Sequence, residues 1–552
     1  MTDLKLKVTM DLSVVLVVGS CFGLLGNGVQ SDRHDEKLQS LPQDQPYRTG
    51  YHFQPPKNWM NGPMSYKGVY HLFYQYNPYA AVWGNITWAH SISYDLVNWI
   101  HLDIALSPDD PFDINGCWSG LTTFLSGGKP IILYTGGVTM NRQVQNLAEP
   151  KNLSDPMLRE WVKSSHNPVI THVDGMDSEN FRDPTTAWQG PDGLRRSKEP
   201  VHSSTRTGMW ECPDFYPVSI DGKNGVDTSS LDKFRKHVLK ASFNSSDHYV
   251  LGNYTAVTDN FSVDTDFLDN GSDLRYDYDN FYASKTFFDS AKKRRILWAW
   301  IQESDSTTDD VKKTGLVYSH FPRSILLSKT GKQLIQWPVE EIEKQRTVNV
   351  RFKNKELKGG SVLEISGITA SQSDVEVSFN SSNLKEADLL DPSWVDPQLL
   401  CSQKTASVGG NIGPFGILVL ASKDLTEQTS IFFRVFRSNE KYVVLMCSDQ
   451  SRSSLEEGPK KTIYGAFIDI DPLNEMISLR SLIDHSIVES FGGEGRACIT
   501  SRVYPKLAID NQAYLYAFNN STFDVNISTL NAWSMKKAQI VSFTKRRKPH
   551  LN

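Results

Sequence analysis

Short apolar and aromatic runs recur along most of this chain, separated by glycine, asparagine, aspartate and proline. Runs of this length predict β-strands, whereas stretches with a 3.6-residue apolar period are scarce. We therefore expect an all-β protein. In the first part of the chain the clearest predicted strands are residues 69–76, 87–93, 130–134, 281–288 and 295–301.

The strands up to about residue 338 fit several four-stranded units, which a β-propeller explains most economically; a sandwich is the alternative. Residues 337–347 predict a short helical linker. A second series of strands follows, and its alternation suggests a β-sandwich. The expected domains are a propeller at 47–336 and a sandwich at 348–552. The predicted strands of the second series are 362–365, 374–379, 415–420, 430–436, 442–447, 487–491 and 513–518.

One segment interrupts the succession of predicted strands. Residues 189–207, QGPDGLRRSKEPVHSSTRT, contain almost no apolar side chains, so no strand is predicted there. The segment lies between two strongly aromatic motifs, FRDPTTAW at 181–188 and WECPDF at 210–215.

Composition changes this picture little. A length of 552 residues agrees with two domains, and 39% hydrophobic and 22% charged residues are ordinary for a globular protein. Aromatic residues, at 11%, either fill β cores or present faces that suit sugar rings. The net charge of −5 argues against a nucleic-acid partner.

The first 28 residues predict a secretory signal peptide, because Lys5 and Lys7 precede an apolar run at 10–25. That run is too short to span a membrane, and no later stretch is apolar enough. Residues 29–46 are polar and are expected to be disordered. We therefore expect a secreted, extracellular protein, and the Asn-x-Ser/Thr sequons agree with glycosylation there. They begin at Asn85, Asn152, Asn244, Asn253, Asn260, Asn270, Asn380, Asn519, Asn520 and Asn526.

Cysteines are few. Cys21 would leave with the signal peptide, and the remaining five are an odd number, so at least one stays free or pairs outside the chain. Disulfides are not expected to carry the stability of the fold. Without a Cys-x-x-Cys motif or a Cys/His cluster, no zinc site or other metal site is expected.

Two acidic motifs are candidates for chemistry. Glycoside hydrolysis commonly needs two carboxyl groups, one to protonate the leaving oxygen and one to attack the anomeric carbon or activate water. Glu211 lies between Trp210 and Cys212, and an apolar surrounding would favour the protonated form that a general acid needs. Asp183 follows Arg182, which would keep it ionised and suited to binding hydroxyls; the alternative is a turn-forming salt bridge. Glu489, in a strand of the second series, is interpreted as structural.

With NGCWSG at 115–120, YHLFYQYNP at 70–78 and a near-match around NWMN at 58–61, these motifs resemble the plant acid invertases of glycoside hydrolase family 32. The resemblance runs from about residue 47 to about residue 540. It implies a five-bladed β-propeller followed by a β-sandwich. It also implies retaining hydrolysis of terminal β-fructofuranosides, sucrose or fructans, without a cofactor. Pro213 resembles the cell-wall subgroup, so a cell-wall location is expected.

The resemblance assigns roles to single positions. Glu211 matches the general acid/base and Asp183 the transition-state stabiliser. The positions that match the fructose pocket are Trp59, Asn61, Gln75, Trp83, Trp118, Ser119, Arg182 and Tyr282.

The chain departs from the family in its first motif, which reads Trp-Met-Asn-Asp-Pro-Asn-Gly-Pro and contains the nucleophilic aspartate. Residues 59–63 here read WMNGP, so Asp-Pro-Asn is missing in frame, and the amide of Asn61 cannot replace a carboxylate nucleophile. In plant invertases a very short exon encodes that tripeptide. The family interval around 189–207 is also longer by about 30 residues, a large part of one blade, so one blade is expected to be truncated. A splice variant or an error of exon prediction explains both gaps more simply than gradual decay.

A third departure concerns specificity. Asn244 occupies a position where sucrose-preferring members have an acid, which resembles fructan exohydrolases. The expected function is therefore hydrolysis of sucrose or fructans, impaired by the missing nucleophile. A non-catalytic sugar-binding protein is the rival. The basic run 545–548 could hold acidic wall polysaccharide, although a solvated terminus is the simpler interpretation.

Overall fold

A computed structural model describes the chain over residues 46–54, 63–79, 84–125, 127–139, 142–172, 177–186, 207–228, 235–258, 260–264, 274–303, 318–439 and 441–542. The predicted signal peptide, nearly all of the predicted disordered segment and the basic run lie outside these residues. Within them, no helix is long and apolar enough to cross a membrane.

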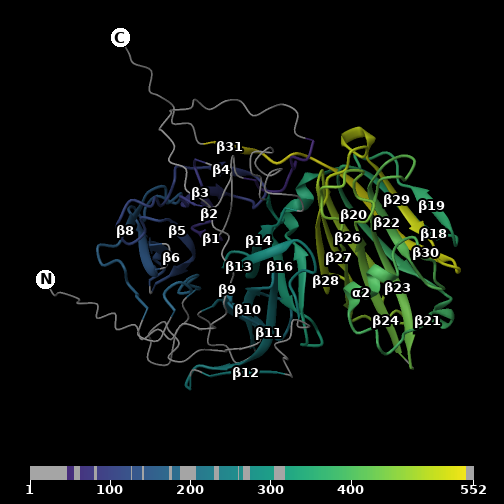
Figure 1. Cartoon of the computed structure of the whole chain (residues 1–552), viewed down its shortest axis with the longest axis horizontal. Coiled ribbons are helices and arrows are strands. Elements are labelled where there is room, and N and C mark those ends of the chain that lie inside the picture. Colours follow the sequence, from purple (N-terminus) through teal and green to yellow (C-terminus); the bar gives the residue numbers. More distant parts are fainter. Residues whose placement is uncertain are drawn as a thin grey trace, which may run out of the picture.

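The first half of the chain forms four antiparallel sheets among the described residues, and the last strand of the chain adds to the first of them (Figure 1). The first sheet has β1 (Pro63–Tyr66), β2 (Val69–Tyr76), β3 (Thr87–Ser93) and β4 (Trp99–His101). The second has β5 (Cys117–Phe124), β6 (Pro130–Thr139), β7 (Arg142–Pro150) and β8 (Trp161–Lys163). The third has β9 (Glu211–Ser219), β10 (Arg235–Phe243), β11 (Ser246–Thr255) and β12 (Asn260–Val263). The fourth has β13 (Phe281–Asp289), β14 (Arg294–Ile301), β15 (Tyr318–Ser319), β16 (Arg323–Leu327) and β17 (Leu334–Pro338).

The first strand of each sheet lies towards a common centre. Contacts join β1 to β5 and β13, and β13 to β9. Neighbouring sheets also cover strands in the middle of a sheet, and seven of the eight residues of β2 are therefore buried. This is why these strands appear in the sequence as continuous apolar and aromatic runs. The arrangement is a β-propeller.

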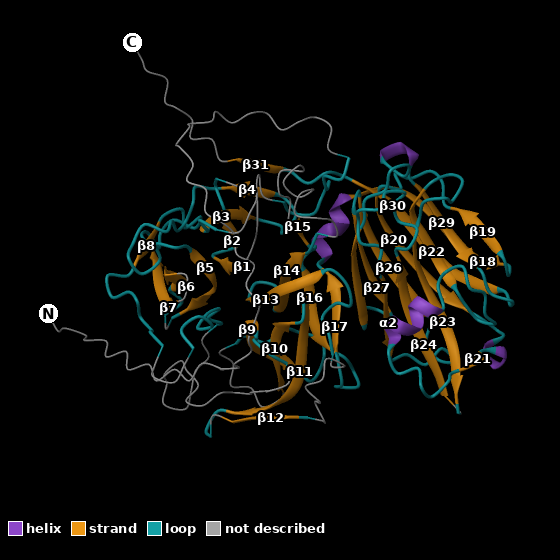
Figure 2. Ribbon diagram, in the orientation of Figure 1, coloured by secondary structure: helices purple, strands orange, loops and turns teal. Residues whose placement is uncertain are grey.

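The second half is a sandwich of two sheets, which Figure 2 shows beside the propeller. One sheet has the order β18 (Arg346–Leu357), β30 (Val525–Met535), β20 (Gln372–Asn380), β26 (Ile477–Asp484), β27 (Ile487–Gly492) and β28 (Ala497–Arg502). The other has β19 (Ser361–Glu364), β29 (Tyr514–Asn519), β22 (Phe415–Ala421), β23 (Thr429–Ser438), β24 (Lys441–Asp449) and β25 (Ile463–Ile468), and β21 (Asp388–Leu389) pairs with β23. The short elements are the 3-10 turns η1 (Glu340–Gln345), η2 (Leu384–Glu386) and η3 (Asp510–Gln512), and α2 (Pro397–Gln403).

A terminal segment of each domain binds to the other domain. In the N-terminal segment, the backbone N–H groups of Gly50, Tyr51 and His52 donate to Asp484 of β26 at 2.6, 2.8 and 3.0 Å. In return β31 (Ile540–Ser542) pairs in parallel with β4 of the first propeller sheet. The expected sandwich boundary at 552 is therefore wrong for this strand, because its backbone bonds are satisfied on the propeller edge.

Charged side chains are buried between the two domains. Glu489 accepts from Arg323 at 2.8 Å and pairs with His52 at 2.9 Å, and all three side chains are fully buried. Arg323 also donates to Asp277 at 2.9 Å. These contacts agree with the interpretation of Glu489 as structural.

The predicted strands lie where the structure has strands, most within one or two residues at each end; 130–134 is the start of a longer strand. Within the predicted linker, η1 covers 340–345. The predicted blade truncation falls at 189–207, and all but the last of these residues lie outside the described part of the chain. The count of five blades therefore stays a prediction.

Candidate active site

Glu211 is the first residue of β9, at the end of an inner propeller strand. It pairs with Ser242 of β10, and the register shifts between Lys240 and Ser242. Cys212, the next residue, has a positive φ of 47°. A bulge of this kind re-aims a side chain away from the regular strand direction, which is common next to active sites.

Two polar side chains contact the carboxylate of Glu211. Arg182 donates to Oε1 at 2.9 Å, and the hydroxyl of Tyr282 donates to Oε2 at 2.6 Å. The side chain of Glu211 is 35% exposed. The expected apolar surrounding is therefore wrong, because Trp210 and Cys212 contribute apolar neighbours along the chain while the carboxylate itself contacts a guanidinium and a phenol. Arg182 likewise forms its ion pair with Glu211 and not with the adjacent Asp183.

Asp183 is 4% exposed and has a positive φ of 65°. A non-glycine residue in the left-handed region costs energy and persists where the surrounding structure enforces it, often at functional sites. Its backbone N–H donates to Thr135 Oγ1 at 2.9 Å, and its Oδ2 accepts the backbone N–H of Cys212 at 2.9 Å. Asp183 and Glu211 are thus held next to each other by the Asp183–Cys212 and Arg182–Glu211 bonds.

Burial and the nearby carboxylates change the pKa of two neighbouring groups. Burial is the main cause that raises the pKa of the Tyr282 hydroxyl, and the adjacent Glu211 adds to it. Burial also raises the pKa of the Cys212 thiol well above its ordinary value, with Asp183 contributing. Both groups therefore stay protonated, and Tyr282 remains a hydrogen-bond donor.

Gln75, Ser119 and Trp118 form a second group on β2 and β5. Gln75 Nε2 donates to Ser119 Oγ at 3.0 Å, and Trp118 Nε1 donates to the Asn115 carbonyl at 3.3 Å. Gln75 is fully buried, and its Oε1 has no hydrogen-bond partner among the described residues. An unpaired buried amide oxygen is costly, so it is suited to accept a hydroxyl of a ligand or a water.

The two groups are connected through β6. Thr135, which accepts from Asp183, lies between Tyr134 and Gly136. Those two residues pair with Gly120 and Cys117, which flank Trp118 and Ser119 on β5. The structure therefore brings Glu211 into direct contact with Arg182 and Tyr282, and it holds Asp183 beside them through the backbone of Cys212. Gln75 lies on β2, and Trp118 and Ser119 lie on β5. Trp59, Asn61 and Trp83 lie outside the described residues.

Sequence reasoning missed a buried charged layer beneath the site. Asp247 accepts the backbone N–H groups of Ala283 and Ser284 at 3.1 and 2.7 Å and pairs with Lys240 at 3.1 Å. Lys240 also donates to the Cys212 carbonyl at 3.1 Å. This layer fixes the start of β13, and hence Tyr282, against the start of β9. A lysine within an apolar run, as in HVLKASF at 237–243, is the sequence signal that could have revealed this buried layer.

A cluster of carboxylates at Asp109, Asp110 and Asp113 has the spacing of a metal site. The ammonium of Lys163 forms ion pairs with all three, at 3.0 Å from Asp110 and 2.8 Å from Asp113. Burial lowers the pKa of Lys163, but the carboxylates outweigh it and raise that pKa overall. The cluster is therefore an ion-pair network built around Lys163, and nothing in it points to a metal ion.

Known proteins resemble the chain over nearly its whole length. The model of the glycosyl hydrolases family 32 N-terminal domain matches residues 52–197 and 192–338, and that of the family 32 C-terminal domain matches 339–534. An insoluble β-fructofuranosidase isoenzyme of Arabidopsis thaliana is 56% identical over 537 residues, which cover 90% of this chain and 92% of that protein. A fructan 6-exohydrolase of Beta vulgaris is 51% identical, covering 91% and 89%. The crystal structure of fructan 1-exohydrolase IIa from Cichorium intybus superposes with a TM-score of 0.88 at 53% identity, covering 91% of this chain and 100% of that chain.

Proposed function

Because the chain belongs to glycosyl hydrolase family 32 and is a glycoside hydrolase, we propose that its site is built to hydrolyse terminal β-D-fructofuranosides, sucrose or fructans. The contact between the Asp183 and Glu211 segments carries this proposal. Glu211, held by two donors and partly exposed, and Asp183, buried on adjacent backbone, suit the acid/base and stabilising roles in fructoside cleavage.

In the proposed reaction Glu211 protonates the glycosidic oxygen and later activates the water that releases fructose. Asp183 stabilises the oxocarbenium-like transition state and binds ring hydroxyls. Arg182 and Tyr282 orient the Glu211 carboxylate through the 2.9 and 2.6 Å hydrogen bonds. Gln75 offers its unpaired Oε1 to a further hydroxyl. A retaining mechanism also needs a nucleophile on the opposite face of the sugar ring.

We propose that this chain lacks the nucleophile, since WMNGP at 59–63 contains no acid. Removing the nucleophile of a well-studied protease lowers turnover by about 10⁶-fold. Turnover by this chain is therefore expected to be several orders of magnitude below that of the related β-fructofuranosidases.

The test compares the chain with a variant in which Asp-Pro-Asn is inserted between Asn61 and Gly62. Sucrose, inulin and levan are assayed with both, and an Ala-Pro-Asn insertion of the same length is the control. We expect activity to rise by at least about 10³-fold with Asp-Pro-Asn alone. Robust turnover by the chain without the insertion would contradict the proposed impairment.

The truncated blade is part of this proposal. The family's N-terminal model matches in two segments that meet at 192–197, inside the apolar-poor segment 189–207, which supports a local loss of sequence. If the Asp-Pro-Asn insertion restores no activity, circular dichroism and a cooperative thermal transition will tell whether the propeller has folded.

Between the two substrates, we propose a preference for fructans. Asn244 and Ser245 form the exposed turn between β10 and β11, both with positive φ, two residues beyond the Ser242–Glu211 pair. An amide there offers no charge to a glucose unit. A variant of the chicory fructan 1-exohydrolase has been solved in complex with 1-kestose. In the reinserted chain, Asn244→Asp is expected to raise the ratio of sucrose to inulin hydrolysis; an unchanged ratio would oppose this assignment.

A non-catalytic sugar-binding protein is the second candidate, because the chain retains pocket residues without the nucleophile. Calorimetric titration of 1-kestose into the chain separates the two: binding without hydrolysis, unaltered by the Asp-Pro-Asn insertion, favours this candidate.

We also propose that the chain is secreted to the cell wall and glycosylated. Related proteins are named cell-wall or insoluble isoenzymes, and the predicted signal peptide and sequons agree with that route. The basic run 545–548 would add affinity for acidic wall polysaccharide.

A further inference from the structure

The outer face of the sandwich carries its own apolar cluster. In the sheet of β22, β23, β24 and β29, alternate side chains point to opposite faces. Ile417 and Ile431 belong to the core between the two sheets, whereas Leu418 and Phe518 belong to a separate cluster on the other face. Helix α2 packs against β24 and β25 over this second cluster.

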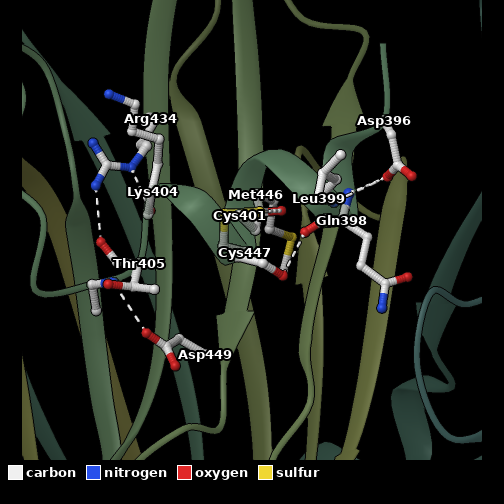
Figure 3. Close-up of a disulfide and its surroundings, with 12 residues drawn as sticks. Asp396, Gln398, Leu399, Cys401, Lys404, Thr405, Arg434, Met446, Cys447 and Asp449 are labelled. Atoms are coloured by element: carbon white, nitrogen blue, oxygen red, sulfur yellow. Dashed lines mark hydrogen bonds between the residues drawn. A yellow bond between two sulfur atoms is a disulfide. The ribbon is translucent and has the colours of Figure 1, made fainter. Parts of the chain in front are cut away.

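Helix α2 and the loop that follows it cover this face and are bonded to the sheet beneath. Cys401 of α2 is bonded to Cys447 of β24, as Figure 3 shows. After the helix, Arg434 donates to the carbonyls of Lys404 and Thr405 at 3.0 and 2.9 Å, and Asp449 accepts the backbone N–H of Ala406 at 3.1 Å (Figure 3). The loop that follows α2 is therefore a fixed wall.

A pocket of about 220 Å³ opens beside this wall, over Leu418 and Phe518. It is lined from β19, β22, β23, β24 and β29, and by Gln428, Asp449 and Arg452 on its polar side. Sites for drug-sized ligands occupy about 300–1,000 Å³. The pocket thus suits one ring-sized group.

The polar side of the pocket favours an uncharged ligand. Asp449 and Arg452 supply one negative and one positive charge, so their charges balance. Gln428 is 8% exposed, and its Oε1 has no hydrogen-bond partner among the described residues. An apolar floor under a rim of amide, carboxylate and guanidinium groups matches a sugar ring, which has a C–H face and a hydroxylated edge.

A sequon lies on the rim of the same pocket. Asn519 and Asn520 both line it, and both begin sequons. The Nδ2 of Asn519 is buried and donates to the carbonyls of Leu357 and Phe523 at 2.9 and 3.0 Å, so it is unavailable for a glycan in the folded chain. Asn520 is half-buried, and its Nδ2 donates at 3.1 Å to the Ala406 carbonyl, a bond that a glycosylated amide can still make.

We propose that this pocket is a second carbohydrate site, separate from the propeller, that holds a single sugar ring on Phe518 and Leu418 and binds its hydroxyls with Gln428 and Arg452. The ring comes either from a free sugar or from the first N-acetylglucosamine of a glycan on Asn520. The chemistry of recognition is the same for both sources.

The test uses the full secreted chain and its Thr522→Ala variant, which removes the Asn520 sequon through an exposed side chain outside the pocket. Glucose and N-acetylglucosamine are the free sugars, since neither carries a fructofuranose ring for the propeller site. Glycopeptide mass spectrometry reports occupancy of Asn520, and saturation-transfer NMR measures sugar binding. Neither readout depends on fructoside hydrolysis.

If the ring comes from the chain's own glycan, the parent chain is occupied at Asn520 and gives no saturation transfer, whereas Thr522→Ala binds N-acetylglucosamine. If a free sugar is the ligand, both chains give saturation transfer. In the Thr522→Ala chain, Gln428→Leu is expected to weaken binding at least about fivefold, the effect of one lost hydrogen bond. Gln403→Leu, on the exposed side of α2, is the matched control and should change nothing. The absence of saturation transfer from Thr522→Ala to either sugar, or a signal that a folded Gln428→Leu variant keeps, overturns the proposal.

Discussion

At the scale of residues, the candidate site depends on hydrogen bonds between segments that are distant in the sequence. Arg182 and Asp183 are neighbours along the chain, yet the guanidinium contacts Glu211 while Asp183 accepts the N–H of Cys212. Asp183 and Cys212, which this bond joins, both have a positive φ. This geometry gives Glu211 two donors and leaves Asp183 buried.

Tyr282 is the residue whose role is tested most cleanly. In the chain with Asp-Pro-Asn reinserted, Tyr282→Phe removes the 2.6 Å bond to Glu211 and little else. A hydrogen bond to a charged group contributes about 1.5–3 kcal/mol, so kcat/KM should fall about 10- to 100-fold with the fold intact. Steady-state kinetics on sucrose and inulin measure this. Tyr442→Phe, in the sandwich, is the control, and an unaltered kcat/KM for Tyr282→Phe would exclude an orienting role.

At the scale of elements, both domains satisfy strand pairing, but central strands and edge strands use apolar residues differently. Propeller strands such as β2 are buried on both faces and therefore appear as continuous apolar runs. Strand β18 lies at the edge of its sheet and exposes most of its side chains, with Lys353 and Lys355 among them. Charged side chains on an edge strand oppose pairing with another molecule.

The short helix α2 depends on covalent and capping bonds. The carboxylate of Asp396 accepts the N–H groups of Gln398 and Leu399 at 2.9 and 3.0 Å. The Cys401–Cys447 disulfide then fixes the helix to β24 across a sequence separation of 46 residues.

Replacing both cysteines by alanine is expected to lower the free energy of unfolding by about 2–4 kcal/mol, because the unfolded chain regains the freedom that the closed loop removes. Urea unfolding monitored by tryptophan fluorescence measures the loss. The parent chain treated with dithiothreitol should lose a similar amount. An identical urea midpoint for the double variant would mean that the hydrogen bonds of Asp396 and Arg434 alone hold the helix.

At the scale of the whole molecule, the two domains are joined through buried charge and exchanged ends. Burial lowers the pKa of His52, but the bonds to Asp484 and Glu489 outweigh it and raise that pKa from 6.5 to about 9. Burial opposes ionisation of Glu489, but Arg323 and His52 lower its pKa from 4.5 to about 2. The charged forms of His52 and Glu489 are therefore favoured in the folded protein.

The pH dependence of stability follows from these directions. The contribution of His52 is complete below pH 6.5, its unfolded pKa, and is lost as the pH rises through about 9. The Glu489 contribution is present above pH 4.5 and is lost as the pH falls through about 2. The interface should accordingly be most stable between about pH 4.5 and 6.5.

Denaturant unfolding at pH 6 and pH 9.5 tests the basic side. We expect a loss on the order of 3 kcal/mol across this interval in the parent chain and a smaller loss in His52→Gln. His485→Gln, half-buried on the sandwich, should behave like the parent. The same loss in parent and His52→Gln would assign the pH dependence to other groups.

The sequence by itself determined the all-β class, the bounds of most strands and the motifs that identify the family. The strands appear as short apolar runs between turn residues, and the reactive residues lie in short contiguous motifs. Glu211, Asp183, Arg182 and Tyr282 were predicted as site residues in this way. Only the tertiary structure decided which of them touch, because those contacts join residues 29 or 71 positions apart. It also decided the Asp247–Lys240 layer, the exchange of chain ends and the pocket over Phe518. Each of these features depends on contacts between segments that are distant in the sequence. A local pattern of apolar and polar residues does not specify which distant partner a buried charge or a strand edge will contact.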